Sequence, residues 1–176
     1  MNKAVYSFVE KTVKPSEVKG KRVLEIGARN VNGSVKPIFL QHGCSEYVGI
    51  DLFSGINVDI IMDGLNAVEN FGAESFDVVV ATEVLEHVEK WQQFIANMKT
   101  VCKQGGIIYL TTRSHGYPPH DFPGDYWRFE AEDVRIMFAD FTVECVEKDT
   151  LSPGVFVKAR KHGVFKKYKK RDVMEC

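Results

Sequence analysis

The chain has 176 residues, a formal net charge of −1, 44% hydrophobic residues and 27% charged residues. These proportions are those of an ordinary globular domain, and they exclude a disordered or fibrous chain. The sequence lacks a run of about 18 apolar residues, the length a membrane span needs, and its first residues, MNKAVYSFVEKTVKPSE, lack the apolar segment of a signal peptide. The four cysteines (Cys44, Cys102, Cys145 and Cys176) are scattered, as in proteins of a reducing compartment. We therefore expect one domain in the cytoplasm, without membrane contact.

Strand and helix patterns alternate along the chain. After a helix expected over residues 4–13 and ended near Pro15, apolar runs predict strands at 22–26, 46–50, 58–62, 76–81 and 107–112. Helical segments are expected at 34–42, 65–71, 89–102 and 131–138, and a last pair of strands at 141–147 and 154–160. This alternation predicts an α/β fold built of right-handed βαβ units around a mostly parallel sheet.

The charge is distributed unevenly. We divide the chain into an N-terminal helix (1–20), one α/β domain (21–160) and a basic tail (161–176). Residues 151–176 hold eight Lys and Arg against two acids. The basic run over 158–171 could contact an anionic partner such as nucleic acid. The alternative, a solvated tail, is favoured because few aromatic residues interrupt the run.

The fourth predicted strand carries the most specific motif. Its apolar run, Phe76–Ala81, opens into Thr82-Glu83 and then Val84–His87, at the strand end where open α/β sheets bind ligands. The string FDVVVATEVLEH resembles the fourth-strand motif of class I S-adenosylmethionine-dependent methyltransferases, in the type 11-like branch whose strand ends in LEH. The resemblance covers about residues 20–160. It implies a Rossmann-like seven-stranded, mostly parallel sheet with helices on both faces and an antiparallel last strand, and S-adenosylmethionine as the cofactor.

The loop after the first strand matches that family in part. In the family an acid and a Gly-x-Gly loop let the backbone approach the methionine and ribose of the cofactor. Glu25, Gly27 and Ala28 fit this pattern, whereas Arg29 stands where the second glycine is usual. This departure leaves weakened cofactor binding open. A turn that needs only one glycine at positive φ is the alternative explanation of the loop.

Two further acids end predicted strands. Asp51 follows Gly27 by 24 residues and could accept hydrogen bonds from both ribose hydroxyls, as acids do in dinucleotide folds. Its neighbour Leu52 would give adenine an apolar face. The resemblance assigns Asp63 to the adenine amine and the backbone N–H groups of Gly64 and Leu65 to the ring edge. The alternative is that both acids cap turns.

Thr82, Glu83 and His87 follow strand four, which the resemblance makes the edge nearest the sulfonium of the cofactor. The resemblance places Thr82 and Glu83 around the methionine part of the cofactor. His87 could act as a general base because the pKa of an imidazole is near 6.5. Alternatively, Glu86 and His87 fix the loop by hydrogen bonds.

A second unusual stretch, HGYPPHDFPGDYWR, occupies residues 115–128. Its end and the next residue form DYWRF, which resembles a string in a bacterial branch of the family. Tyr117, His120 and Asp121 are candidates for acceptor contact, and His87, His120 and Asp121 are our candidate catalytic residues. His115, His120, Asp121 and Asp125 are residue types that bind metals, but their spacing is weak, and we predict no metal site.

These residues predict methyl transfer from S-adenosylmethionine to an oxygen or nitrogen acceptor, a small molecule or glycan rather than nucleic acid. One alternative is a degenerate methyltransferase fold that serves as a scaffold, which the Arg29 departure supports. Another is a nucleic-acid methyltransferase that uses the basic tail, although Thr82-Glu83-Val84-Leu85 replaces the Asn-Pro-Pro-Tyr motif of base-flipping enzymes. A pyridine-dinucleotide site would need a fuller glycine set. Because no cap domain is evident, we expect an open site for an extended acceptor, or a site completed by a homodimer or a partner protein.

Overall fold

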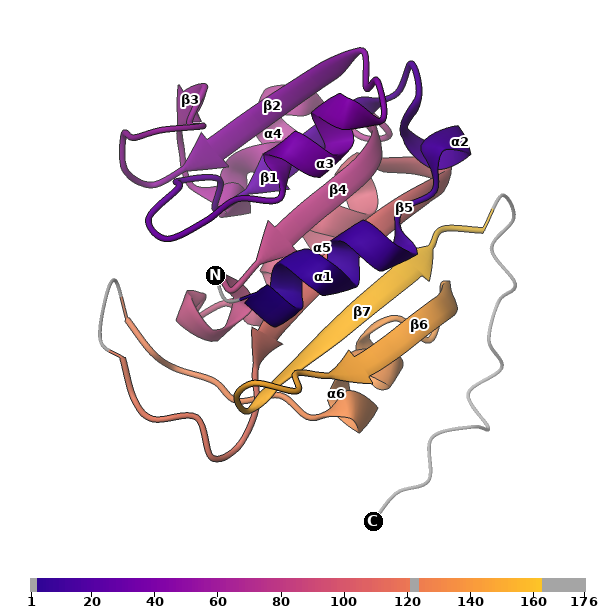
Figure 1. Ribbon diagram of the computed structural model, residues 1–176. Coiled ribbons are helices and arrows are strands. Elements are labelled where there is room, and N and C mark those ends of the chain that lie inside the picture. Colours follow the sequence, from indigo (N-terminus) through magenta and orange to yellow (C-terminus); the bar gives the residue numbers. More distant parts are fainter. Residues whose placement is uncertain (1–2, 121–123, 163–176) are drawn as a thin grey trace.

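The computed structural model describes residues 3–120 and 124–162, which form a seven-stranded sheet in the order β3-β2-β1-β4-β5-β7-β6 (Figure 1). Strands β1 to β5 run parallel to one another, and β7 lies antiparallel between β5 and β6. The predicted mostly parallel sheet with an antiparallel last strand is confirmed. Its strands are β1 Arg22–Ile26, β2 Glu46–Asp51, β3 Ile60–Ile61, β4 Phe76–Thr82, β5 Cys102–Arg113, β6 Thr142–Lys148 and β7 Gly154–Arg160.

Helices cover both faces of the sheet, as predicted. One face packs against α1 (Lys3–Thr12), α2 (Pro15–Val18) and α3 (Lys36–Gln41), and the other against α4 (Ala67–Phe71), α5 (Trp91–Val101) and α6 (Ala131–Met137) (Figure 1). Two short 3₁₀ turns, η1 (Gly64–Asn66) and η2 (Leu85–His87), follow β3 and β4.

The central strands are apolar on both sides because both of their faces are buried. Along β4, Val78 and Val80 belong to the core on the α1–α3 side, whereas Val79 and Ala81 belong to the core on the α4–α6 side. This period of two is the pleat of the strand. The continuous apolar run therefore buries β4 in the centre of the sheet, with its polar residue Thr82 at the carboxyl end of the strand.

Apart from small shifts of element ends, three differences from the prediction stand out. Pro15 begins the short helix α2 as its first residue, because a proline at that position loses no helical hydrogen bond. Strand β3 keeps only two residues at the edge of the sheet. Strand β5 begins at Cys102 rather than residue 107, and a register shift between Phe76 and Val78 accommodates the extra residues.

Two lysines of the basic run over 158–171 are buried in the folded domain. Lys158 is buried and forms ion pairs with Glu17 at 2.7 Å and Glu144 at 3.1 Å. The Lys161 ammonium donates to the carbonyl oxygens of Lys99 and Cys102. These side chains are therefore not free to contact an anionic partner. The rest of the predicted tail, 163–176, lies outside the described residues.

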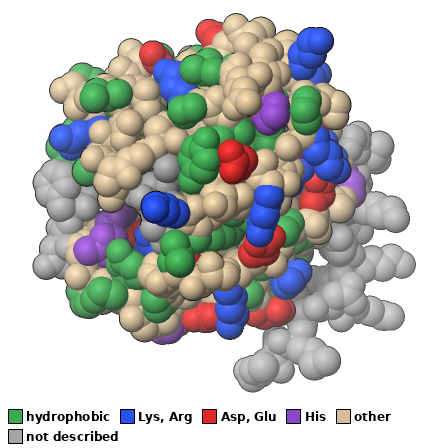
Figure 2. Space-filling model, in the orientation of Figure 1, with side chains coloured by type: hydrophobic (Ala, Val, Ile, Leu, Met, Phe, Trp, Pro, Cys, Tyr) green, Lys and Arg blue, Asp and Glu red, His purple; other side chains and the backbone are tan. Residues whose placement is uncertain are grey.

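The face seen in Figure 1 carries mixed charge. Acidic and basic side chains are interspersed with apolar ones over its described part (Figure 2). Within the described residues, no helix is long and apolar enough to cross a membrane.

Candidate functional site

A cavity of about 360 Å³ opens at the carboxyl ends of β1, β2 and β4. It lies where β1 pairs with β2 on one side and with β4 on the other. The chain order reverses at that point, and such a switch point is where open α/β sheets bind ligands. The site predicted from the strand ends and the cavity of the folded chain therefore coincide.

The loop after β1 forms one wall of the cavity. Gly27 adopts a φ of +78°, and a Cβ on it would come within 2.2 Å of the Val84 side chain. Its backbone N–H and that of Ala28 donate to the carbonyl of Ile50 at 2.8 and 3.0 Å. Arg29, in contrast, has no left-handed φ, and its side chain lies over the Phe53 ring. The backbone thus requires glycine at 27 but not at 29.

Two acids at the carboxyl ends of β2 and β3 form a further part of the cavity wall. Asp51 accepts from the backbone N–H of Arg29 at 3.1 Å and of Phe53 at 3.0 Å, one on each carboxylate oxygen. A carboxylate offers about four acceptor positions, so the carboxylate is fixed and keeps capacity for a ligand. Asp63 accepts from the N–H of Leu65 at 2.9 Å and caps η1. Both acids therefore cap turns and also line the cavity, so the two roles considered for them are not exclusive.

Glu25 lies beneath the loop. It is 2% exposed, lines the cavity and accepts from the hydroxyl of Tyr47 at 2.8 Å. Burial raises the pKa of Glu25 to about 7, against the opposing effects of the Tyr47 hydrogen bond and the charge of Lys36. The Glu25 carboxyl group therefore changes its charge near neutral pH.

Glu83 stands at the strained end of β4. Its φ is +60°, an uncommon value for a residue with a side chain. The carboxylate forms a buried ion pair with Arg113 and accepts from the Thr111 hydroxyl at 2.9 Å. Burial raises the pKa of Glu83, although the charge of Arg113 opposes it. Glu83 lines the cavity as predicted, but its carboxylate is engaged with β5.

Glu86 is fully buried below the cavity. One carboxylate oxygen, Oε2, accepts from the Thr112 hydroxyl at 2.9 Å, whereas Oε1 is buried without a hydrogen-bond partner. Burial and the neighbouring Glu83 carboxylate raise the pKa of Glu86 to about 8. Its backbone carbonyl accepts from the N–H groups of Tyr126 and Trp127.

His87 joins the same region to the loop after β5. Its Nδ1 contacts the carbonyl oxygen of Gly124. Because a carbonyl only accepts, Nδ1 carries the proton and Nε2 keeps its lone pair. The two roles considered for His87 are therefore not exclusive, since this residue fixes the loop and also lines the cavity.

The loop after β5 places His120 against His87, with ring centroids 4.6 Å apart. Asp125 accepts from the backbone N–H of His120 at 2.9 Å and forms a two-pronged ion pair with Arg128. Arg128 holds the pKa of Asp125 far below its usual value. Burial and the nearby His87 lower the pKa of His120. The Asp125–Arg128 pair thus anchors the segment that presents His120.

Most of the predicted site residues meet in one place. The cavity is lined by Glu25, Gly27, Ala28, Arg29, Asp51, Leu52, Asp63, Gly64, Thr82, Glu83, His87, Tyr117 and His120. Leu65 is not part of this lining, and its N–H is used by Asp63. Asp121 lies outside the described residues.

The prediction missed Arg113, which lines the cavity and holds Glu83. It is the last residue of β5, and the predicted strand stopped one residue earlier. Asp51 was predicted because it is a charged residue at the end of an apolar strand. Arg113 follows the run at 107–112 in the same way, so the same signal could have predicted it. Glu86 also lines the cavity. The feature that marks it as a candidate site residue is its buried carboxylate oxygen without a hydrogen-bond partner, which only the folded structure reveals.

Comparison with known proteins agrees with this geometry. The sequence model of a family described as "Methyltransferase domain" matches residues 2–146. A ubiquinone biosynthesis O-methyltransferase from Hahella chejuensis is 32% identical over 106 residues, which are 53% of this chain and 43% of that protein. A mitochondrial enzyme of the same description from Rattus norvegicus is 49% identical over 43 residues, 24% of this chain and 12% of that protein. The chain spans less than half the length of these curated relatives.

Solved structures share the fold. A 1,6-didemethyltoxoflavin-N1-methyltransferase from Burkholderia thailandensis, with bound S-adenosylhomocysteine, aligns with a TM-score of 0.73 at 15% identity, over 92% of this chain and 80% of that one. An S-adenosylmethionine-dependent methyltransferase from Mesorhizobium loti aligns with a TM-score of 0.67 at 16% identity, over 90% and 98% of the two chains. With the family match over most of its length, the chain belongs to the methyltransferase domain family, within the class I S-adenosylmethionine-dependent methyltransferases.

Proposed function

We propose that this protein transfers a methyl group from S-adenosylmethionine to an oxygen atom of a small molecule or glycan. The observation that carries the proposal is the cavity at the switch point, because its two sides differ in chemistry. One side carries the acids at the strand ends, and the other carries imidazole and phenol groups from η2 and the loop after β5. The match to an O-methyltransferase over about half of the chain supports oxygen as the acceptor atom.

The acids fit the polar groups of the cofactor. Asp51 is fixed by two backbone donors and keeps acceptor capacity for ribose hydroxyls. Leu52, half exposed beside it, offers an apolar surface to a purine ring. Glu25 and Asp63 flank this position and attract the cationic and amine groups of the same ligand.

When bound, S-adenosylmethionine supplies a methyl group on a sulfonium, whose leaving group is a neutral thioether. The protein therefore needs to align the acceptor more than to protonate a leaving group, and alignment can account for about 7–11 kcal/mol of a barrier. His87 and His120 lie on the acceptor side, where an imidazole can take the proton of a hydroxyl. Asp121, the third candidate, stays a prediction.

Transfer of a labelled methyl group from S-adenosylmethionine to a panel of phenols, dihydroxylated aromatics and sugars tests this function. We expect transfer to at least one hydroxylated acceptor, and we expect His120→Ala to lower kcat more than it raises the KM for S-adenosylmethionine. Methyl transfer confined to nitrogen acceptors or to nucleic acid would contradict the proposal.

A further inference from the structure

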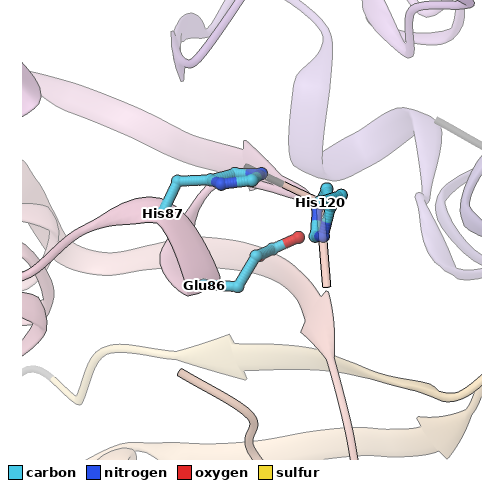
Figure 3. A group of neighbouring side chains, drawn as sticks. All are labelled: Glu86, His87 and His120. Carbon is cyan, nitrogen blue, oxygen red and sulfur yellow. The ribbon is translucent and has the colours of Figure 1, made fainter. Parts of the chain in front are cut away.

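Glu86, His87 and His120 form a cluster outside the predicted cofactor contacts. Glu86 and His87 belong to η2, and His120 comes from the loop after β5, 33 residues further along the chain. The three side chains point toward one another (Figure 3), and one ligand atom from each lies within 4.8 Å of the other two. All three line the cavity.

We propose that these three side chains bind a divalent transition-metal ion on the acceptor side of the cavity. Two imidazoles and one carboxylate suit ions such as zinc, iron or nickel, whereas magnesium and calcium prefer sites made of oxygen ligands. At a bond length of about 2.1 Å and tetrahedral angles, two ligands on one ion lie about 3.4 Å apart. The three ligand atoms, which lie within 4.8 Å of one another, therefore need to approach one another by at most about 1.4 Å to close around an ion.

Buried polar atoms without partners point to a ligand at this position. The Oε1 atom of Glu86 is buried without a hydrogen-bond partner, and the side chain belongs to a residue that is 0% exposed. The Nδ1 atom of His120 is also buried without such a partner, although it lies 3.3 Å from Asp125. Buried polar groups in native proteins are nearly always satisfied. A cation bound by the Glu86 carboxylate would give its buried oxygen a partner.

Neighbouring contacts orient the ligands in the way metal sites require. The Nδ1–H group of His87 donates to Gly124, which leaves Nε2 as the coordinating atom. The Thr112 hydroxyl holds the second carboxylate oxygen of Glu86 at 2.9 Å. The Asp125–Arg128 pair fixes the segment that carries His120. Glu83 is engaged by Arg113 and is not part of the ligand set.

Of the set considered from the sequence, His120 belongs to this site, and Asp121 lies outside the described residues. His115 lies against Glu130, and Asp125 is paired with Arg128. Three protein ligands leave coordination positions open toward the cavity, as in catalytic metal sites. An oxygen atom of the acceptor can occupy them. With the ion bound, His87 and His120 serve as ligands and the ion rather than an imidazole would activate the acceptor hydroxyl, and this part of the inference rests on the proposed function. The binding of the metal ion itself does not depend on the proposed function.

Titration of the chelator-treated full chain with Zn²⁺, and separately with Mg²⁺, tests the site. We expect one Zn²⁺ per chain, bound more tightly than Mg²⁺, and about a hundredfold weaker binding in Glu86→Gln and in His120→Ala. His115→Ala, which removes an exposed histidine of the same loop, is the matched control and should bind as the wild type does. Circular dichroism on each variant separates loss of a ligand from loss of the fold.

The inference is overturned if wild type binds no Zn²⁺, if Mg²⁺ binds more tightly, or if the ligand variants bind like His115→Ala. Titration of the same metal-free protein with S-adenosylhomocysteine distinguishes this failure from failure of the proposed function. Retained cofactor binding without metal binding would remove the metal site alone, whereas absent cofactor binding with intact metal binding would remove the methyltransferase proposal and leave the metal site standing.

Discussion

Arg113, the last residue of β5, forms a buried ion pair with Glu83, the first residue after β4. The two side chains are 7% and 12% exposed, and Arg113 also pairs with Asp149 at 3.2 Å. One guanidinium thus links the end of β4, which forms the cavity wall, to the turn between β6 and β7. This pair fixes the strained backbone at Glu83 and the shape of the acceptor side.

Removal of the two partners should have unequal effects on stability. We expect Arg113→Met to lower the free energy of unfolding by about 3–5 kcal/mol, because it leaves buried carboxylates without their cation. Glu83→Gln should cost less, since Arg113 keeps Asp149. Urea unfolding of the two single variants and the double variant measures the coupling, with Lys11→Met, which breaks an exposed pair with Glu147, as the control at less than about 1 kcal/mol. Equal losses from the two single variants would contradict this account.

The contact of Gly27 with Val84 predicts a loss of cofactor affinity in Gly27→Ala. An added Cβ meets Val84 at 2.2 Å and must also adopt a φ of +78°. Gly20 has a φ of +70° with nothing within 4 Å of the added atom, so Gly20→Ala carries the backbone strain alone. By isothermal titration we expect about tenfold weaker binding of S-adenosylhomocysteine, equivalent to about 1.4 kcal/mol, in Gly27→Ala only. Equal affinity of the two variants would show that the clash does not shape the site.

The buried Glu25 predicts a pH-dependent stability. Because folding raises the pKa of Glu25 from 4.5 to about 7, its stabilising contribution is complete below about pH 4.5 and is lost as the pH rises through 7. The loss amounts to roughly 3 kcal/mol. Glu25→Gln keeps an acceptor for the Tyr47 hydroxyl but does not titrate. We expect the difference in unfolding free energy between wild type and Glu25→Gln to change across this window in urea titrations without ligand, and a constant difference would refute the assignment.

The sequence was most informative where local pattern and tertiary role agree. Strand β1 was predicted to the residue because an apolar run buried on both faces ends at Gly27, which the backbone requires. The start of β5 was missed, because residues 102–106 contain two glycines and pair through a register shift that depends on β4. Helix α2 was missed altogether, because Pro15, which was expected only to end the first helix, also begins a second one.

Some residues of the candidate site could be predicted from the sequence, and others could not. Acids at strand ends, such as Asp51, can be found from the sequence, since parallel strands bring their carboxyl ends to one edge. The cluster of Glu86 with His120 cannot, because it depends on how the loop after β5 folds back onto η2. That path is set by contacts such as the N–H of Tyr126 to the carbonyl of Glu86 at 2.9 Å. Long-range contacts of this kind leave no periodic signal in the chain.

We expect the cavity at the ends of β1, β2 and β4 to bind S-adenosylmethionine through Asp51. Isothermal titration of wild type, Asp51→Ala and Asp140→Ala with S-adenosylhomocysteine tests it most directly. Asp140 lies in a surface ion pair with Lys99, away from the cavity. We predict micromolar binding to wild type and to Asp140→Ala, and at least about tenfold weaker binding to Asp51→Ala, since hydrogen bonds to a charged group contribute about 1.5–3 kcal/mol. Absent binding to wild type, or equal binding to all three proteins, would contradict the account.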